Sequence, residues 1–305
     1  MNKENNFASA VIYCYNDKNL IPFFIDGLCK KMEETFLKYE IIIVNDCSID
    51  DSKELIKNYA SLQNDQVITI LNMSYHQGIE VAMNAGVNLS IGDFVFEFDS
   101  MFVDYEWNLL NKIYFHSLKG YDIVSVKIDK KPRFLSEIFY KLFNNYANLQ
   151  HNIGIETFRI LSRRAINRIH SITKTIPFRK AAYANCGLPL DTVIYHPLSP
   201  VHWEKYKGRK SLAIDTLILF TNIAYKITIT LTGIMMTITV GVSLYALIYK
   251  LMKNPVEGWT TTILFLSFGF FGLFLILAMV IKYLQIIVKL NFRKKQFLFE
   301  SIEKL

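Results

Sequence analysis

The chain has 305 residues, of which 51% are hydrophobic, and a formal net charge of +7. That hydrophobic fraction is high for a wholly soluble protein, so the excess has to be located along the chain. The positive charge does not call for nucleic acid as a partner, because basic residues that flank apolar segments meet anionic lipid. The four cysteines show no paired spacing, which argues against a cysteine metal site or a disulfide framework.

The first half of the chain alternates short apolar runs with amphipathic segments, a pattern typical of a parallel sheet covered by helices. The expected strands are 9–14, 40–45, 67–71, 94–98 and 122–127. The expected helices are 20–38, 50–61, 78–90 and 105–118. In such a sheet the ligand crevice lies at the carboxyl ends of the strands. The residues found there are Tyr15, Asn16, Asp17, Asp46 and Asp99.

Asp46 ends a strongly apolar run and is followed by polar residues. A carboxylate in this place can accept hydrogen bonds from a nucleobase or a ribose. The plainer alternative is that the polar residues, Ser48 or Asp50, only cap the next helix. The residues alone leave both interpretations open.

The middle of the chain is predicted to hold an aromatic-rich helix over 134–148 and a further apolar run over 158–161. Basic side chains cluster just before that helix, and Lys127 and Arg133 are candidate phosphate or acceptor contacts. The Lys130-Lys131 pair between them can equally form a solvated or lipid-facing patch.

Two segments near the carboxyl end, 227–249 and 258–281, contain no charged residue and are each long enough to span the ~30 Å hydrocarbon layer as a helix. Buried core helices are the alternative, but these normally carry a polar face. Segment 211–225 is mixed apolar and polar and is predicted to be an interfacial helix. Lysine and arginine precede the first span and follow the second, which favours a hairpin with both termini in the cytoplasm. The polar start of the chain does not look like a secretory signal.

Several short motifs follow one another in a fixed order: Tyr15-Asn16-Asp17, 44–50, 78–86, Gly92-Asp93 and Asp99. Their order and spacing resemble the family 2 glycosyltransferases, which have a nucleotide-sugar-binding fold called GT-A. Later segments, 139–143, 158–163 and 208–211, and the paired spans are similar to the branch that loads sugars onto polyprenyl phosphates. Dolichol-phosphate mannose synthases and bactoprenol glucosyltransferases are members of that branch.

The resemblance implies an α/β fold of the GT-A type, with a mostly parallel sheet and flanking helices. It implies a cytoplasmic catalytic domain over 1–210, the interfacial helix over 211–225, a transmembrane hairpin over 226–288 and a basic cytoplasmic tail over 289–305. The expected location is the cytoplasmic membrane, as a multi-pass protein.

The resemblance also assigns roles to residues. Those expected to bind the nucleotide sugar are Tyr15, Asn16, Asp17, Asp46 and Asp99. The expected catalytic residues are Asp99, near the diphosphate, and Arg159, beside the phosphates. Lys210 and Ser211 lie in one of the similar motifs. Together with Lys127 and Arg133, which are candidates from their positions near the strand ends, they are the expected phosphate or acceptor contacts.

Three positions depart from the family's pattern. The usual Asp-any-Asp metal motif reads Asp99-Ser100-Met101, so the second carboxylate is missing and a thioether stands in its place. A Mg²⁺ or Mn²⁺ site at Asp99 is therefore expected to be weak. Glu156-Thr157 replaces a Gly-Asp pair, which moves the acidic group one position earlier and, in a strand, onto the opposite face. His76 follows Tyr75 where Arg-Asn is common, and it is either a phosphate contact or an ordinary surface residue.

These features predict an inverting glycosyltransferase that moves a sugar from a nucleoside diphosphate sugar to a polyprenyl phosphate at the cytoplasmic membrane face. One alternative keeps the chemistry but uses another lipid or a polysaccharide as acceptor. The other is a degenerate fold that binds a nucleotide or a partner protein without transferring sugar. The sequence does not decide the sugar, the nucleotide base or the metal requirement, and it leaves a homo-oligomer open.

Overall fold

The computed structural model describes residues 3–61, 67–130, 134–146, 151–172, 178–198 and 299–304, together with isolated helical positions between 230 and 287. The chain divides into two compact units. The first comprises Met1–Asn144, Leu149–Lys207 and Lys295–Leu305, and the second Asn145–Asn148 and Gly208–Lys294.

The predicted interfacial helix, 211–225, lies outside the described residues, and the predicted spans, 227–249 and 258–281, lie mostly outside them. Among the helices that the structure does describe, none is long and apolar enough to cross a membrane. The transmembrane hairpin stays a prediction.

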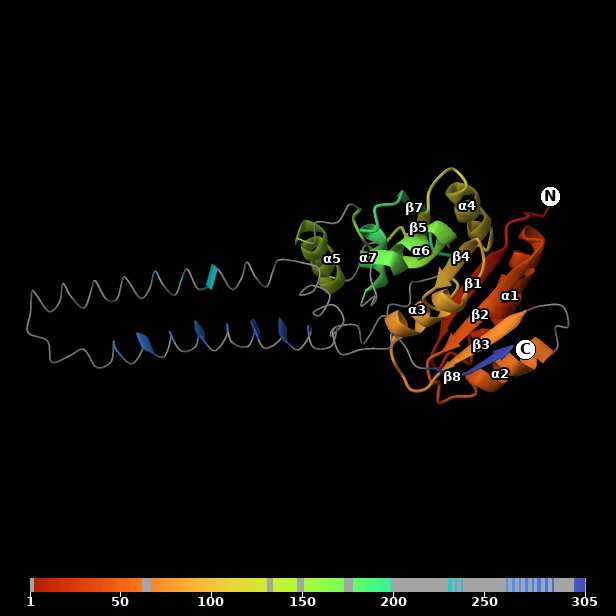
Figure 1. The fold of residues 1–305 in the computed structure, drawn as a ribbon, viewed down its shortest axis with the longest axis horizontal. Coiled ribbons are helices and arrows are strands. Elements are labelled where there is room, and N and C mark those ends of the chain that lie inside the picture. The colour runs from red at the N-terminus through yellow and green to blue at the C-terminus, as the bar shows by residue number, and fades with distance from the viewer. Residues whose placement is uncertain are drawn as a thin grey trace, which may run out of the picture. The chain divides into compact units, whose positions relative to one another are not determined.

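A single eight-stranded sheet organises the first unit, in the order β7-β5-β6-β4-β1-β2-β3-β8 (Figure 1). Its strands are β1 Ala8–Cys14, β2 Tyr39–Asn45, β3 Ile68–Met73, β4 Phe94–Phe98, β5 Ile123–Ile128, β6 Glu156–Ser162, β7 Leu190–Tyr195 and β8 Phe299–Lys304. The pairs β1–β2, β1–β4, β2–β3 and β5–β7 are parallel. The pairs β4–β6, β5–β6 and β3–β8 are antiparallel. The predicted α/β sheet with flanking helices is confirmed, and each of the five predicted strands falls on an observed one. The sequence predicts a mostly parallel sheet, whereas the observed sheet is mixed, because three of its seven strand pairs are antiparallel.

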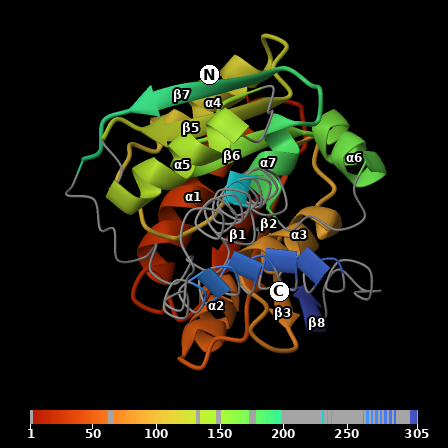
Figure 2. The same ribbon diagram turned by 90° about the vertical axis from the view of Figure 1, so that its left-hand side faces the viewer.

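Helices cover both faces of the sheet. They are α1 Ile21–Thr35, α2 Ser52–Ser61, α3 Ile79–Leu89, α4 Asn108–Ser117, α5 Phe134–Tyr146, α6 Arg163–Ile172 and α7 Arg179–Ala184. Side chains of α1, α2 and α4 pack with one face of the sheet, and those of α3, α6 and α7 with the other. Figure 2 shows α1 and α2 on one side of the sheet and α3 and α6 on the other. Successive side chains of β1 point to opposite faces of the sheet, so that Ile12 packs in the first hydrophobic core and Val11 in the second.

Helix α3 packs very closely against β1 and β2, and Gly86 allows this. A Cβ atom at Gly86 would lie 2.5 Å from Val11 Cγ1 and 2.6 Å from Val44 Cγ2. Any larger residue would push the helix away from the sheet. The start of α3 therefore stays close to the carboxyl ends of these strands.

The end of the chain returns to the sheet, which the sequence did not suggest. Residues 299–304, within the predicted basic tail, form β8 and pair with β3, and Figure 1 shows β8, in blue, beside β3, in orange. Asn72 of β3 donates hydrogen bonds to Ser301 Oγ at 3.0 Å and to Glu303 Oε1 at 3.2 Å. Lys57 of α2 forms an ion pair with Glu303. The carboxyl end of the described chain is thus part of the same sheet as β1 and β2.

Candidate active site

Two loops at the carboxyl ends of β1 and β2 interlock. Asn16 N donates to Ser48 Oγ at 3.1 Å, Ile49 N donates to Asn16 Oδ1 at 2.9 Å, and Lys18 N donates to Asp50 Oδ2 at 3.2 Å. Asn16 and Cys47 both have left-handed backbone, with φ of 55° and 59°. Non-glycine residues in that conformation cluster at functional sites, where the surroundings hold them. The loops form one rim.

Asp46 lies beneath this rim and is fully buried. Its carboxylate accepts hydrogen bonds from Gln77 N at 2.8 Å, from Gly78 N at 2.9 Å and from Tyr13 Oη at 2.9 Å. Gly78 precedes α3 with a φ of 86°, which favours glycine. Asp46 therefore fastens the end of β2 to the start of α3. Its contact with a nucleoside stays a prediction.

The helix-capping contact that the sequence left open is made by Asp50. Asp50 Oδ1 accepts a hydrogen bond from Ser52 N, the first residue of α2, at 3.1 Å. Next to it, in the loop after β1, Asp17 Oδ2 accepts from Tyr15 N at 3.3 Å, and Asp17 N donates to Ser52 Oγ at 3.2 Å. All the predicted nucleotide-binding residues of β1 and β2 thus meet at one edge of the sheet.

An aromatic pair stands on the rim. The rings of Tyr15 and His76 stack with centroids 4.1 Å apart and an interplanar angle of 25°. His76 Nδ1 lies 3.0 Å from Asp46 Oδ2, and the histidine side chain is 49% exposed. Flat aromatic side chains at a rim can stack a nucleobase. The structure thus joins His76 to the predicted nucleotide residues.

Arg159 and Asp99 meet in a buried ionic cluster at the end of β4. Arg159 Nη2 donates to Asp99 Oδ2 at 3.0 Å, Nη1 donates to Glu97 Oε2 at 2.6 Å, and Nε donates to Glu156 Oε2 at 3.1 Å. A second guanidinium, from Arg179 of α7, binds Asp99 Oδ1 at 2.7 Å and Glu97 Oε2 at 3.0 Å.

Sequence reasoning missed Glu97, Arg179 and the further partner of Arg179, Glu80. Glu97 lies on β4, two residues before Asp99, which follows the strand, and its Oε1 accepts from Tyr183 Oη at 2.6 Å. A glutamate inside an apolar strand was the available signal, because a buried charge needs a partner. The positions of its partners, on β6 and α7, could not be read from that signal.

The cluster is almost completely withdrawn from water. Glu97 and Arg159 are 0% exposed and Arg179 is 1% exposed. Burial alone would lower the pKa of both guanidiniums, but the negative charge of Asp99 and the glutamates raises the pKa of each well above its usual value. Breaking a buried pair by removing one partner typically costs about 3–5 kcal/mol, because the other charge stays behind unpaired.

The residues around Asp99 do not fit a divalent cation in this arrangement. Each of its two carboxylate oxygens accepts a hydrogen bond from a guanidinium. Met101, where the second carboxylate of the metal motif would stand, is 1% exposed and packs in the hydrophobic core. In the described parts of the chain, no three His, Cys, Asp or Glu side chains come together to hold a metal.

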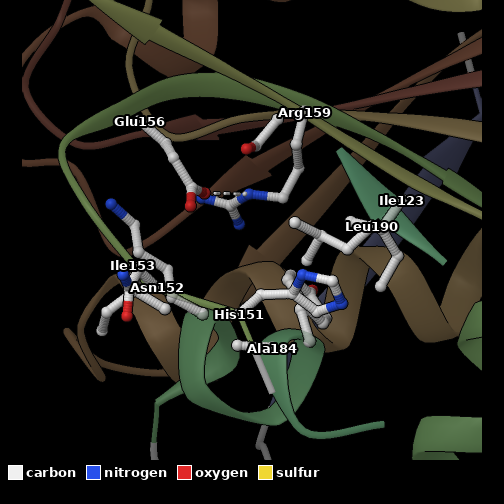
Figure 3. A pocket seen from close by; sticks show the side chains of 11 residues that line it. Ile123, His151, Asn152, Ile153, Glu156, Arg159, Ala184 and Leu190 are labelled. Carbon is white, nitrogen blue, oxygen red and sulfur yellow. Dashed lines mark hydrogen bonds and ion pairs between the residues drawn. The ribbon is translucent and has the colours of Figure 1, made fainter. Parts of the chain in front are cut away.

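A small pocket lies beside the cluster, between β5, β6 and α7 (Figure 3). Figure 3 shows Glu156 and Arg159 turned toward each other, with His151 and Asn152 across the pocket. Lys180 also lines it and donates to Gly154 O at 3.1 Å. The pocket therefore places polar and basic groups next to the Arg159 guanidinium.

The remaining candidates are less well placed by the structure. Lys127 is exposed on β5 and stands opposite Glu156 in the strand register. It is thus at the same sheet edge as Asp99. Arg133, Lys210 and Ser211 lie outside the described residues.

Comparison with known proteins gives consistent matches. The profile of the family described as Glycosyl transferase family 2 matches residues 9–186, which include the rim and the ionic cluster. An uncharacterised glycosyltransferase of Synechocystis sp. is 27% identical over 194 residues, which make up 61% of this chain and 60% of that protein. The match therefore spans less than two thirds of that relative's length. The bactoprenol glucosyl transferase of Shigella phage SfV is 24% identical over 272 residues, 85% of this chain and 87% of that protein.

Among solved structures, glucosyl-3-phosphoglycerate synthase from Mycobacterium tuberculosis, in complex with phosphoglyceric acid, has a similar fold. The TM-score is 0.50 at 14% identity, over 71% of this chain and 80% of that chain. At that identity the likeness concerns the fold alone.

Proposed function

This chain belongs to glycosyl transferase family 2, and on that premise we propose that it transfers one sugar from a nucleoside diphosphate sugar to a polyprenyl phosphate at the cytoplasmic face of a membrane. The observation that carries the proposal is the set of side chains gathered at the carboxyl ends of the central strands. The Tyr15–His76 ring pair and the interlocked loops follow β1, β2 and β3, and Asp99 with Arg159 lies at the end of β4.

The donor's nucleoside is assigned to the rim. Tyr15 and His76 offer a stacking surface for the base, and the interlocked loops that contain Asn16 and Asp17 offer polar groups for the ribose. Asp46 holds the loop before α3 in place from below. The diphosphate then points toward the end of β4 and toward Lys127.

The reaction needs no general base from the protein. A phosphate monoester has a second pKa of about 6, so the acceptor phosphate is already largely a dianion near neutral pH. One of its oxygens attacks the anomeric carbon, the bond from that carbon to the donor diphosphate breaks, and the electron pair leaves with the nucleoside diphosphate. The configuration is inverted. The protein supplies positioning and stabilises the charge that grows on the leaving diphosphate.

One observation supports a polyprenyl lipid as acceptor, since a relative similar over 85% of this chain is named a bactoprenol glucosyl transferase. The sheet topology bears only on the predicted hairpin, because the chain leaves the sheet after β7 and returns to it as β8. If the intervening segment crosses a membrane, it must do so an even number of times, as a hairpin does. Tags before Met1 and after Leu305 should then be accessible from the same side, the cytoplasm. A tag that is reached only from the outer side would refute this topology.

The transfer itself is tested with the purified full chain, a panel of nucleoside diphosphate sugars and a short-chain polyprenyl phosphate. The expected result is a glycosylated lipid, with one nucleoside diphosphate released per lipid formed. Tyr15→Ala should weaken donor binding, whereas Lys112→Ala, on the exposed face of α4, should not. Transfer only to another lipid or to a polysaccharide would mean that polyprenyl phosphate is not the acceptor. Donor binding without transfer to any acceptor would favour the degenerate fold, an outcome that the occupied carboxylate of Asp99 motivates.

A further inference from the structure

Arg159 and Arg179 surround Asp99 with matching sets of contacts. Each guanidinium donates through Nη1 to Glu97 Oε2 and through Nη2 to a different oxygen of Asp99. Each also donates through Nε to a glutamate of its own, Glu156 at 3.1 Å for Arg159 and Glu80 at 3.1 Å for Arg179. Two arginines from separate elements thus share the same two carboxylates.

Arg179 is fixed in this position by its backbone as well. It begins α7, and its backbone N–H donates to Glu80 Oε2 at 2.8 Å, the same oxygen that its Nε contacts. The side chain is 1% exposed. A planar guanidinium can reach three carboxylates at fixed angles, which the single ammonium of a lysine cannot do. The geometry of the cluster therefore depends on arginine and not only on its positive charge.

A cation on Asp99 would have to compete with these contacts. A divalent cation bound by a carboxylate needs at least one of its oxygens, and both oxygens of Asp99 already accept from an arginine. The second position of the metal motif has no carboxylate, because it is Met101, which packs in the core. The guanidinium groups of Arg159 and Arg179 therefore occupy the position at Asp99 where a divalent cation would bind.

We propose that Arg179, together with Arg159, takes the place that a divalent cation would need at Asp99, so that this chain binds its donor without a cation on that carboxylate. Arg179 is then a positioning residue that holds Asp99 and the end of β4. This inference rests on the proposed function for the identity of the donor. Its central claim, that Asp99 is not a cation ligand while Arg179 is present, concerns the protein alone.

The test measures binding of Mn²⁺ alone, by electron paramagnetic resonance, to the full chain and four variants. The variants are Asp99→Asn, Arg179→Met, the double variant that combines both changes, and Arg168→Met as a matched control on the exposed face of α6. Wild type, Asp99→Asn and Arg168→Met should bind Mn²⁺ equally. The Arg179→Met variant should bind Mn²⁺ with an affinity at least about tenfold higher than that of wild type. The double variant should bind it with the affinity of wild type. Because Mn²⁺ is the only ligand, failure of the proposed function would not affect the result.

The proposal would be overturned if Asp99→Asn bound Mn²⁺ with an affinity about tenfold lower than that of wild type. If Arg179→Met does not fold, the comparison of wild type with Asp99→Asn still decides the point, and Arg179→Lys gives the charge-conserving case. A second measurement follows UDP and GDP binding in chelator and in excess Mn²⁺. Equal affinity of the preferred nucleotide in both conditions is expected for wild type. A nucleotide that binds only with Mn²⁺, and no longer does so in Asp99→Asn, contradicts the proposal.

Discussion

Arg179 Nη2 lies 2.7 Å from Asp99 Oδ1, although the two residues are 80 positions apart in the sequence. One begins α7, and the other follows β4, the strand next to β1 at the centre of the sheet. The pair links α7, which packs on one face of the sheet, to the end of β4. Folding of α7 and the shape of the candidate site are therefore coupled.

The first prediction concerns that coupling. Arg179→Met leaves the buried Glu97 and the partly buried Glu80 and Asp99 with one partner fewer, so the free energy of unfolding should fall by about 3–5 kcal/mol. Urea unfolding of the full chain in detergent, followed by circular dichroism, measures it. Arg168→Met, an exposed arginine on α6, should change the same quantity by less than about 0.5 kcal/mol. Equal effects of the two changes would mean that the cluster does not stabilise the fold.

The second prediction concerns Asp46. In Asp46→Asn an amide NH₂ replaces one carboxylate oxygen and faces backbone N–H groups, which leaves a buried donor without an acceptor at a cost of about 1–3 kcal/mol. The loop before α3 should shift, and donor affinity should fall. Unfolding and nucleotide-sugar titrations measure the two effects. Asp51→Asn, at an exposed neighbour, should alter neither. Normal stability with lost donor binding would instead point to direct contact only.

The third prediction uses the cysteines as reporters. Burial raises the pKa of the Cys14 thiol and of the Cys29 thiol to about 12, and it also raises the pKa of Cys186. Cys47 is only half-buried and lies on the rim that the loops after β1 and β2 form. Iodoacetamide at about pH 8 should therefore modify Cys47 first, and bound donor should slow that reaction. Peptide mass spectrometry reads both. Unchanged labelling of Cys47 at saturating donor would argue that the nucleoside binds elsewhere.

The fourth prediction is a pH dependence at Asp122, before β5. Burial alone would raise the pKa of Asp122, but hydrogen bonds from Arg164 and from Ser162, the latter at 2.6 Å, bring it below its ordinary value of 3.8. The folded protein thus holds this proton less tightly than the unfolded chain does. The stabilisation is fully present above pH 3.8 and is lost as the pH falls through the lower, folded-state pKa. Near neutral pH, wild type should have a higher free energy of unfolding than Asp122→Asn. Urea unfolding at a series of pH values should show that this difference in free energy becomes smaller in acid. A difference that becomes larger in acid would contradict this.

The fifth prediction concerns β8. Deleting residues 299–305 uncovers the edge of β3 and removes the partners of Asn72, so the chain should melt at a lower temperature and self-associate. Thermal unfolding and gel filtration measure this. Glu303→Gln, which breaks only the ion pairs with Lys53 and Lys57, should have a small effect. Similar behaviour of deletion and substitution would mean that strand pairing contributes little.

What the sequence by itself determined is local. Apolar runs of strand length that end in polar residues located β1, β2 and β4, and they placed Tyr15, Asp46 and Asp99 at one edge of the sheet, because parallel strands end together. The order of those motifs also indicated family 2, which the profile match confirms.

The tertiary structure decided which charges meet. Glu80, Glu97 and Arg179 lie on α3, β4 and α7, and nothing in their local surroundings marks them as partners. The insertion of β6 antiparallel between β4 and β5, and the return of β8 to β3, likewise depend on contacts between distant segments. A charged residue inside an apolar strand indicates that a partner of opposite charge is needed. Which residue becomes that partner depends on how the helices pack on the sheet. For that reason Asp99, which the sequence presented as a weak metal ligand, lies in the structure between two arginines.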